Sequence, residues 1–225
     1  MTLAGRMPAR SLRRENRYPK MKPQTAARLA RGISWVLHPF ALPLYLLALL
    51  LTATPFALFP VRVKIYLVWV VALYAVMLPV LSLGLLRSLG RISDFRVDRR
   101  RERVWPLLIG TVCYVLCAVT IAKIPQMVFL RKFMLAAACC EAMCLAVSLR
   151  WKISLHMTAM GAAVALLAVM NVVAAVPLLV PLMAAIAASG MLASARLYLG
   201  CHDPWQILAG FGGGFVVAAL ALLFL

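Results

Sequence analysis

Apolar runs of roughly twenty residues recur along most of this chain, a length that matches the hydrocarbon core of a bilayer when the run is helical. Seven such segments can be read, at 34–59, 65–87, 104–122, 127–149, 155–174, 178–195 and 205–225. They lack the alternation of a transmembrane β-barrel, and only helices or closed barrels satisfy their backbone hydrogen bonds in lipid. The sequence therefore predicts an all-α fold, a polytopic bundle of transmembrane helices with six to seven spans.

The first segment is the one that leaves the number of spans open. It contains His38-Pro39 and Pro43, which favour a kinked or broken helix, so six full spans and one irregular segment are an alternative to seven. Before it, residues 1–33 hold nine Lys or Arg and the single acid Glu15. Such a like-charge run predicts a disordered basic tail, followed by one membrane domain over 34–225.

Basic residues are distributed unevenly between the two predicted faces. Of the 24 Lys and Arg residues, 19 fall in the tail or in the loops after the second, fourth and sixth segments. Because positive charge concentrates on the cytoplasmic side, the amino terminus and these three loops are expected to be cytoplasmic. The net charge of +18 lies close to the predicted spans, which favours anionic membrane lipids as partners over nucleic acid.

The loop at 90–106 is densely charged. Asp94, Asp98 and Glu102 are spaced four residues apart, as on one stripe of a helix, and arginines stand between them. Three interpretations remain open. The loop can be a solvated helix whose arginines contact lipid phosphates, Arg100 and Arg103 can clamp a substrate phosphate, or the acidic stripe can hold a divalent metal and a pyrophosphate.

Two histidines, His156 and His202, stand where apolar segments meet basic loops. The roughly 40 mostly apolar residues between His156 and Arg196 suffice for two crossings, which returns both histidines to one membrane face. Ser154 and Arg196 accompany them and can bind phosphate oxygens. Imidazole is a nucleophile when neutral and a proton donor when charged, the two roles needed to move phosphate onto a histidine and then to water.

These loops resemble the type 2 phosphatidic acid phosphatase superfamily, whose three motifs read Lys-x6-Arg-Pro, Pro-Ser-Gly-His and Ser-Arg-x5-His-x3-Asp. Ser154-Leu155-His156 is similar to the second motif, and Arg196, His202 and Gln206 fit the spacing of the third. A closer likeness is to a branch of small bacterial membrane proteins in this superfamily. It rests on Lys-Ile-Ser-x-His, Ala-Arg-x5-His-x-Pro-x-Gln, Ala-Gly-Phe and an Arg-x-Glu-Arg-x-x-Pro loop.

The resemblance implies an integral membrane lipid phosphatase in the inner membrane of a bacterial cell, with neither metal nor cofactor. It implies that His202 is the nucleophile that forms a phosphohistidine and that His156 protonates the leaving alcohol. Its substrate is expected to be a lipid such as a polyprenyl diphosphate, phosphatidylglycerol phosphate or phosphatidate. The residues implied to hold the phosphate oxygens are Arg196, Arg103, Arg100, Lys152 and Ser154.

The chain departs from the superfamily pattern at several positions. Gln206 replaces the Asp that orients the nucleophilic histidine; its neutral amide can accept a hydrogen bond from the ring but cannot stabilise an imidazolium as a carboxylate does. Ile153 and Leu155 replace the Pro and Gly of the second motif, and the Arg-Pro pair of the first is absent. Bacterial members usually face outward, whereas the charge distribution predicts cytoplasmic loops.

Two functions of other classes therefore stay open. One is a non-catalytic protein that binds anionic lipid phosphates. The other is a metal-dependent prenyl- or phospho-transferase that uses Asp94, Asp98 and Glu102.

Two further features lie within the apolar segments. Glu141 is an acid in the middle of the fourth segment, where burial requires a partner such as Lys132, Tyr114 or a polar group of another helix. In the last segment Gly210, Gly212, Gly213 and Gly214 form a run of small residues that permits close helix packing.

Overall fold

The computed structural model describes residues 24–95, 97, 99–173 and 176–225. Within these residues the regular structure is helical and contains no strand. The α-helices are α1 (Gln24–Val36), α2 (Leu42–Ala53), α3 (Val61–Ala72), α4 (Leu78–Ser88), α5 (Val104–Ile121), α6 (Val128–Ser148), α7 (Leu155–Val172), α8 (Leu179–Tyr198) and α9 (Pro204–Phe224). Three short 3-10 turns accompany them, η1 (Pro55–Leu58), η3 (Arg100–Arg103) and η4 (Pro125–Met127).

The prediction of an all-helical fold with helices suited to a membrane is confirmed. In the described part of the chain, five helical stretches are long and apolar enough to cross a bilayer: Val61–Ser88, Arg100–Ile121, Leu155–Val172, Leu179–Tyr198 and Pro204–Phe224. The count of six to seven spans is not reached by this measure. The fourth predicted segment forms the 21-residue helix α6, which carries three charged residues, and the first forms only the 12-residue helix α2.

The stretch Val61–Ser88 is one continuous helix with a wider turn in its middle. The wider turn is the π-helical segment η2 (Leu73–Met77), where the N–H of Leu78 bonds the carbonyl of Leu73, five residues back. Pro79 follows directly. In a regular α-helix its ring would collide with the carbonyl of the residue four positions earlier, and it has no N–H to bond that carbonyl. The proline therefore accounts for the π turn without ending the helix.

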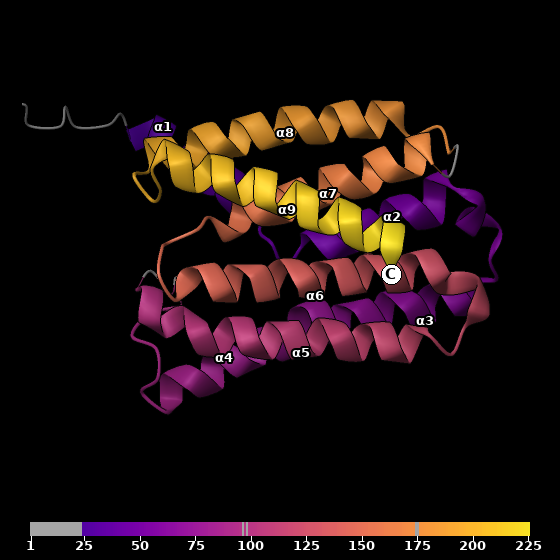
Figure 1. Ribbon diagram of the computed structural model, residues 1–225, viewed down its shortest axis with the longest axis horizontal. Helices are drawn as coiled ribbons and strands as arrows, with labels where there is room; N and C mark the ends of the chain where they lie inside the picture. Colours follow the sequence, from indigo (N-terminus) through magenta and orange to yellow (C-terminus); the bar gives the residue numbers. More distant parts are fainter. Residues whose placement is uncertain (1–23, 96, 98, 174–175) are drawn as a thin grey trace, which may run out of the picture.

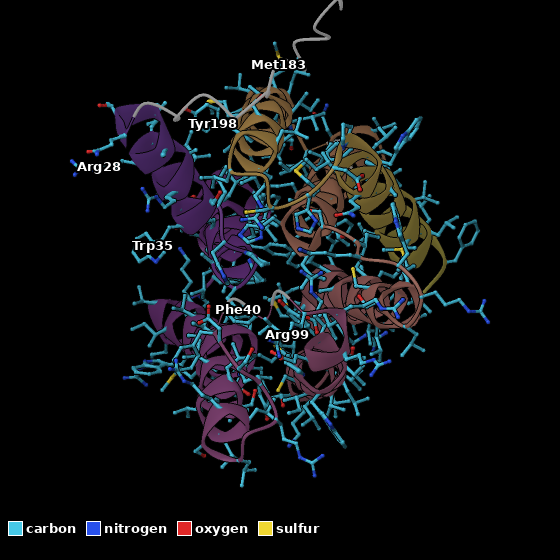
Figure 2. All side chains as sticks on the ribbon, turned by 90° about the vertical axis from the view of Figure 1, so that its left-hand side faces the viewer. Arg28, Trp35, Phe40, Arg99, Met183 and Tyr198 are labelled. Carbon is cyan, nitrogen blue, oxygen red and sulfur yellow. The ribbon has the colours of Figure 1, made fainter. Side chains whose placement is uncertain are left out.

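The helices form two halves that meet along α6 and α9 (Figure 1). One half contains α3, α4, α5 and α6; the other contains α1, α7, α8 and α9, with α2 beside α7. The largest buried apolar cluster extends through both halves and includes Leu47, Leu67, Ile121, Met134 and Leu166. Outward apolar side chains such as Met183 on α8 are exposed (Figure 2), as expected for helices that face lipid.

Glycine brings α7 and α9 into close contact. A Cβ atom at Gly214 would collide with the backbone of Thr158, and one at Gly161 would collide with the backbone of Phe211. At Gly210 a Cβ would lie 2.8 Å from the carbonyl oxygen of Ser154. The expected role of small residues in α9 is therefore observed at Gly210 and Gly214, and α7 contributes Gly161 from the opposite side.

Two predicted segments differ from the structure. The tail was expected to be disordered to residue 33, but α1 begins at Gln24, because Ala26, Ala30 and Ile33 form an apolar stripe that lies against α8. The acidic stripe was expected on a helix, whereas residues 89–95 form turns and bends, with left-handed backbone at Gly90. Residues 1–23, Arg96 and Asp98 lie outside the described residues.

The three loops that carry the sequence motifs lie at one end of the bundle. The connections after α4, α6 and α8 are all at the left of Figure 1, together with α1. The connections after α2, α5 and α7 lie at the opposite end. The expected gathering of His156 and His202 at one face of the molecule is thus present.

Candidate functional site

His202 is held in the turn before α9 by a local set of hydrogen bonds. The side chain of Asp203 caps the helix by accepting a hydrogen bond from the backbone N–H of Gln206 at 2.9 Å. Gln206 in turn places its Oε1 atom 2.8 Å from Nδ1 of His202. Since an amide oxygen only accepts, Nδ1 carries the proton and Nε2 keeps a lone pair. Gln206 therefore fixes the orientation of the ring through Nδ1 and leaves Nε2 as the nitrogen available to a ligand.

The ring of His202 is only 8% exposed. Burial lowers the pKa of His202 to about 4, the bond with Gln206 opposes this shift, and the charges of Arg196, Lys152 and Arg103 reinforce it. At neutral pH the imidazole is therefore uncharged, the state in which Nε2 can act as a nucleophile.

His156 lies in the first turn of α7 and contacts the α1 region. Its Nε2 atom lies 3.2 Å from the carbonyl oxygen of Ser34 in α1, so Nε2 carries the proton and Nδ1 is the remaining ring nitrogen. The ring of His38 packs edge-on against that of His156, with centroids 5.2 Å apart. His38 accepts a hydrogen bond from the backbone N–H of Phe40 at its Nδ1 atom, 3.3 Å away, which leaves an N–H at Nε2.

Two arginines stand beside the histidines. Arg196 lies in the last turn of α8, and its Nε atom is buried without a hydrogen-bond partner. Arg103 is 5% exposed and donates from Nε to the carbonyl of Val97, at 3.0 Å, and from Nη1 to that of Ile153, at 2.9 Å. Val97 has a φ of 47°, an unfavourable value for a β-branched residue, and this conformation directs its carbonyl toward Arg103.

Of the other expected phosphate ligands, Lys152 lies close enough for its charge to lower the pKa of His202, whereas Ser154 and Arg100 lie apart. Lys152 donates from Nζ to the carbonyl of Cys201 at 3.2 Å and so joins the α6–α7 and α8–α9 loops. Ser154 is 0% exposed, packs against Gly210, and its hydroxyl makes no hydrogen bond. Arg100 is exposed on η3. The structure therefore brings together Arg196, Arg103 and both predicted histidines, places Lys152 beside them, and leaves Ser154 and Arg100 outside the group.

The acidic stripe is also distributed differently from the expectation. Glu102 accepts hydrogen bonds from the backbone N–H and the hydroxyl of Ser93, each at 3.0 Å, and lies 3.6 Å from Arg99. Asp94 is exposed. Among the residues that the structure describes, no group of three His, Cys, Asp or Glu side chains is arranged to hold a metal ion.

The histidines and both arginines line one cavity of about 200 Å³ between the two halves of the bundle. The view in Figure 2 looks onto the end of the bundle that carries this site; Phe40 lies between the two halves, while Arg28 and Trp35 project outward from α1. Away from the histidines the wall is mainly apolar. The polar and charged side chains that line the cavity are His38, Arg103, Tyr114, Glu141, His156, Thr158, Arg196 and His202.

Sequence reasoning missed His38 as a site residue and treated it as part of a helix break. The feature that could have identified His38 is the interruption of the first apolar segment around His38 and Pro39. Because α2 begins only at Leu42, the turn that precedes it carries His38, Pro39 and Phe40 into the wall of the cavity. A polar residue beside a broken apolar segment is a common mark of a binding site in membrane proteins.

Comparisons with family models, with curated proteins and with solved structures find no match to this chain.

Proposed function

We propose that this protein is an integral membrane phosphatase that hydrolyses a lipid phosphomonoester or pyrophosphate through a phosphohistidine at His202. One observation carries the proposal: His202, held by Gln206 with Nε2 unprotonated, shares a cavity with His156, Arg196 and Arg103 among helices of membrane length. The apolar remainder of the cavity suits a lipid chain.

In the first step, Nε2 of His202 attacks phosphorus and the bond from phosphorus to the lipid oxygen breaks. The substrate binds as a phosphate monoanion, and its proton passes to Nδ1 of neutral His156. His156 then gives this proton to the leaving alcohol while Nε2 stays bonded to Ser34. In the second step, His156 takes a proton from water, the resulting hydroxide attacks phosphorus, and the bond from phosphorus to nitrogen breaks. His156 passes this proton to the departing inorganic phosphate, and both histidines are again neutral.

The cations neutralise the charge that develops on the phosphoryl oxygens. Arg196 is the main candidate because its buried Nε donor has no hydrogen-bond partner among the residues that the structure describes. Arg103 is fixed in place by two backbone carbonyls and adds a second positive charge. Positioning and electrostatic stabilisation supply most of the catalysis in phosphoryl transfer, so we propose that the reaction proceeds without a metal.

The membrane arrangement that fits this function has six crossings and one partial crossing. The five apolar stretches and α6 supply the six. Helix α2, about 18 Å long, supplies the partial one, and its amino-terminal residues Leu42 and Pro43 line the cavity. We infer that the charged end of the bundle faces the cytoplasm, in the inner membrane of a bacterial cell, in contact with anionic lipids.

The degenerate motifs fit a divergent member of the type 2 phosphatidic acid phosphatase superfamily. Gln206 makes the hydrogen bond to the nucleophilic histidine that a carboxylate makes in that family. The proposed chemistry does not depend on this membership, because it is argued from the cavity and its side chains.

The test is phosphate release by the purified protein in detergent, with a chelator present, from a panel of lipid monophosphates and diphosphates. We expect release from at least one lipid, and its loss in His202→Ala, in His156→Ala and in Arg196→Ala. Arg101→Ala is the matched control, since Arg101 is exposed on η3 away from the cavity. Release that requires a divalent metal would favour the transferase class, and release that is unaffected by His202→Ala would refute the proposal.

A non-catalytic lipid-phosphate binder is the second candidate, and a specific observation favours it. Lys152 and Ser154, both expected at the phosphate, instead join loops and helices. Binding of lipid phosphates without turnover by any member of the panel would establish this alternative.

A further inference from the structure

Glu141 lies in the wall of the cavity, away from the histidines. It stands on α6 seven residues before Ser148, about 10 Å along the helix from that end. Its Oε2 atom is buried and has no hydrogen-bond partner in the described part of the chain. A buried carboxyl without a partner is strongly unfavourable in an apolar region, so its presence calls for an explanation.

The neighbouring helix makes room for this carboxyl group. A Cβ atom at Gly110 of α5 would collide with both carboxylate oxygens and with Cδ of Glu141. Only glycine at this position allows α5 and the carboxyl group to come so close. The side chain of Glu141 is therefore accommodated in the fold by a specific residue of the facing helix.

Four donors of the surrounding helices bond other acceptors, while Tyr114, the other partner expected from the sequence, lines the same cavity as Glu141. Lys132, expected as a partner from the sequence, donates to the carbonyl of Leu222 at 3.3 Å. The hydroxyl of Thr158 donates to the carbonyl of Ser154 at 3.1 Å. The thiols of Cys140 and Cys144 contact the carbonyl of Gly214 at 3.6 Å and the hydroxyl of Thr158 at 3.4 Å. No hydrogen bond from these four side chains reaches Glu141.

We propose that Glu141 is a specificity subsite that accepts a hydrogen bond from a hydroxyl or amine carried by the lipid near its phosphate. The inference rests on the proposed function for the position of the phosphate, at Arg103, Arg196 and His202. Gly110, which faces Glu141, is seven residues from Arg103 along η3 and α5, about 10 Å deeper in the bundle. The 2-hydroxyl of a glycerol lipid or the 2-amine of a sphingoid lipid is on the second carbon from the phosphate oxygen, so the Glu141 side chain must extend toward the histidine end of the cavity to reach it.

The subsite distinguishes two classes of lipid phosphate. A lysophosphatidate or a sphingoid base phosphate carries a hydroxyl or amine that can bond the carboxyl group of Glu141, which lines the cavity. A prenyl or simple alkyl phosphate carries none and leaves the carboxyl unpaired in the complex. A site built to bond a polar group discriminates strongly against analogues that lack it.

The experiment compares the binding of two non-hydrolysable phosphonates, the analogue of 1-oleoyl lysophosphatidate and the same molecule without its 2-hydroxyl. A third arm uses the same lysophosphatidate phosphonate with its 2-hydroxyl replaced by an amine, which separates an amine donor from a hydroxyl. We expect the wild-type protein to bind the hydroxylated compound about tenfold more tightly than the deoxy compound, because the deoxy compound leaves a buried polar group unpaired in the complex.

In Glu141→Leu the ratio of the two dissociation constants should fall to about one, because the acceptor is gone. Glu141→Gln keeps an acceptor oxygen and should retain most of the preference for the hydroxyl. Ala142→Leu is the matched control, because Ala142 is exposed on the same helix and does not line the cavity. Gly110→Ala displaces the carboxyl group and should also lower the ratio, which provides a second variant if Glu141→Leu does not fold.

A ratio that is unchanged in a monodisperse Glu141→Leu protein would overturn the subsite, as would a wild-type protein without preference. Because the probes are not hydrolysed, the result does not depend on catalysis. A preference that requires Glu141 in a protein that hydrolyses no lipid would retain the subsite and reject the phosphatase.

Discussion

The ring nitrogens of the two central histidines have different partners, and this difference assigns their chemistry. Nδ1 of His202 bonds a side-chain amide, whereas Nε2 of His156 bonds a backbone carbonyl of another helix. The nitrogen left on His202 is Nε2 and the one left on His156 is Nδ1. In the proposed reaction these are the atoms that bond phosphorus and exchange the proton.

Replacing Gln206 tests the orientation of the nucleophile. Gln206→Leu removes the acceptor and leaves the N–H of a nearly buried ring unpaired, so we expect kcat to fall by about 10- to 100-fold, the usual effect of losing such an orienting partner. Steady-state hydrolysis of the best lipid substrate measures this. Wild-type kcat in a folded Gln206→Leu protein would show that the bond plays no role in catalysis.

The pH dependence of kcat/KM follows from the environment of His202. Because its pKa is lowered to about 4, the ring stays neutral as the pH falls below 6.5, and activity should decline on the acid side only near pH 4. Gln206→Glu places a carboxylate beside the ring, favours the imidazolium and should move this acid limb to higher pH. Because the substrate is the same for both proteins, its own ionisation cannot cause a difference between their pH profiles. Identical profiles would contradict the assignment of this limb to His202.

The sequence allowed much of this residue-level site to be predicted, but not all of it. Spacing and residue type identified His156, Arg196, His202 and Gln206. They could not identify His38, because a single histidine in an apolar segment has no local signal of what it contacts. The burial of Ser154 depends on Gly210 of a helix fifty residues later, and such pairings between distant helices cannot be read from a local motif.

At the scale of the elements, helix positions follow directly from apolar length. The last five predicted segments agree with α5 to α9 to within about three residues, the usual uncertainty of helix ends. The breaks were harder to place, because they depend on packing. Pro79 produced a π turn within a continuous helix, whereas Pro39 stands in a complete break. The two outcomes depend on whether neighbouring helices satisfy the released backbone groups.

The contact between α7 and α9 holds the two histidine loops together and can be tested with glycine substitutions. In Gly214→Ala the new methyl group meets the backbone of Thr158, which cannot move aside, so we expect a loss of stability of about 2 kcal/mol. Gly212→Ala is the control on the same helix, because nothing lies within 4 Å of the added atom. Thermal unfolding in detergent should show a lower midpoint for the first variant and an equal or higher one for the second. Equal midpoints would indicate that α7 and α9 are not packed in this way.

At the scale of the whole molecule, most of the described basic residues lie at the same end of the bundle as the site. Among the described residues, Arg91 is at this end and Lys123 at the other, in the connection between α5 and α6. This asymmetry is the basis for placing the site at the cytoplasmic face.

The orientation can be measured by labelling single cysteines with an impermeant thiol reagent in a background from which the six native cysteines have been removed. We expect Arg91→Cys to be labelled only in inverted vesicles and Lys123→Cys only from the cell exterior. The reverse pattern would place the site on the outer face. Labelling of both positions from one side would be incompatible with the arrangement of the helices.

The central claim is that phosphate passes through His202, and the most direct measurement is to trap that intermediate. A substrate labelled with radioactive phosphorus, mixed with the protein and quenched in alkali, should leave label on the chain. We predict label that is stable to base, released by acid, absent from His202→Ala and mapped to the peptide that contains His202. Turnover that leaves no label, or label on any other residue, would contradict the account.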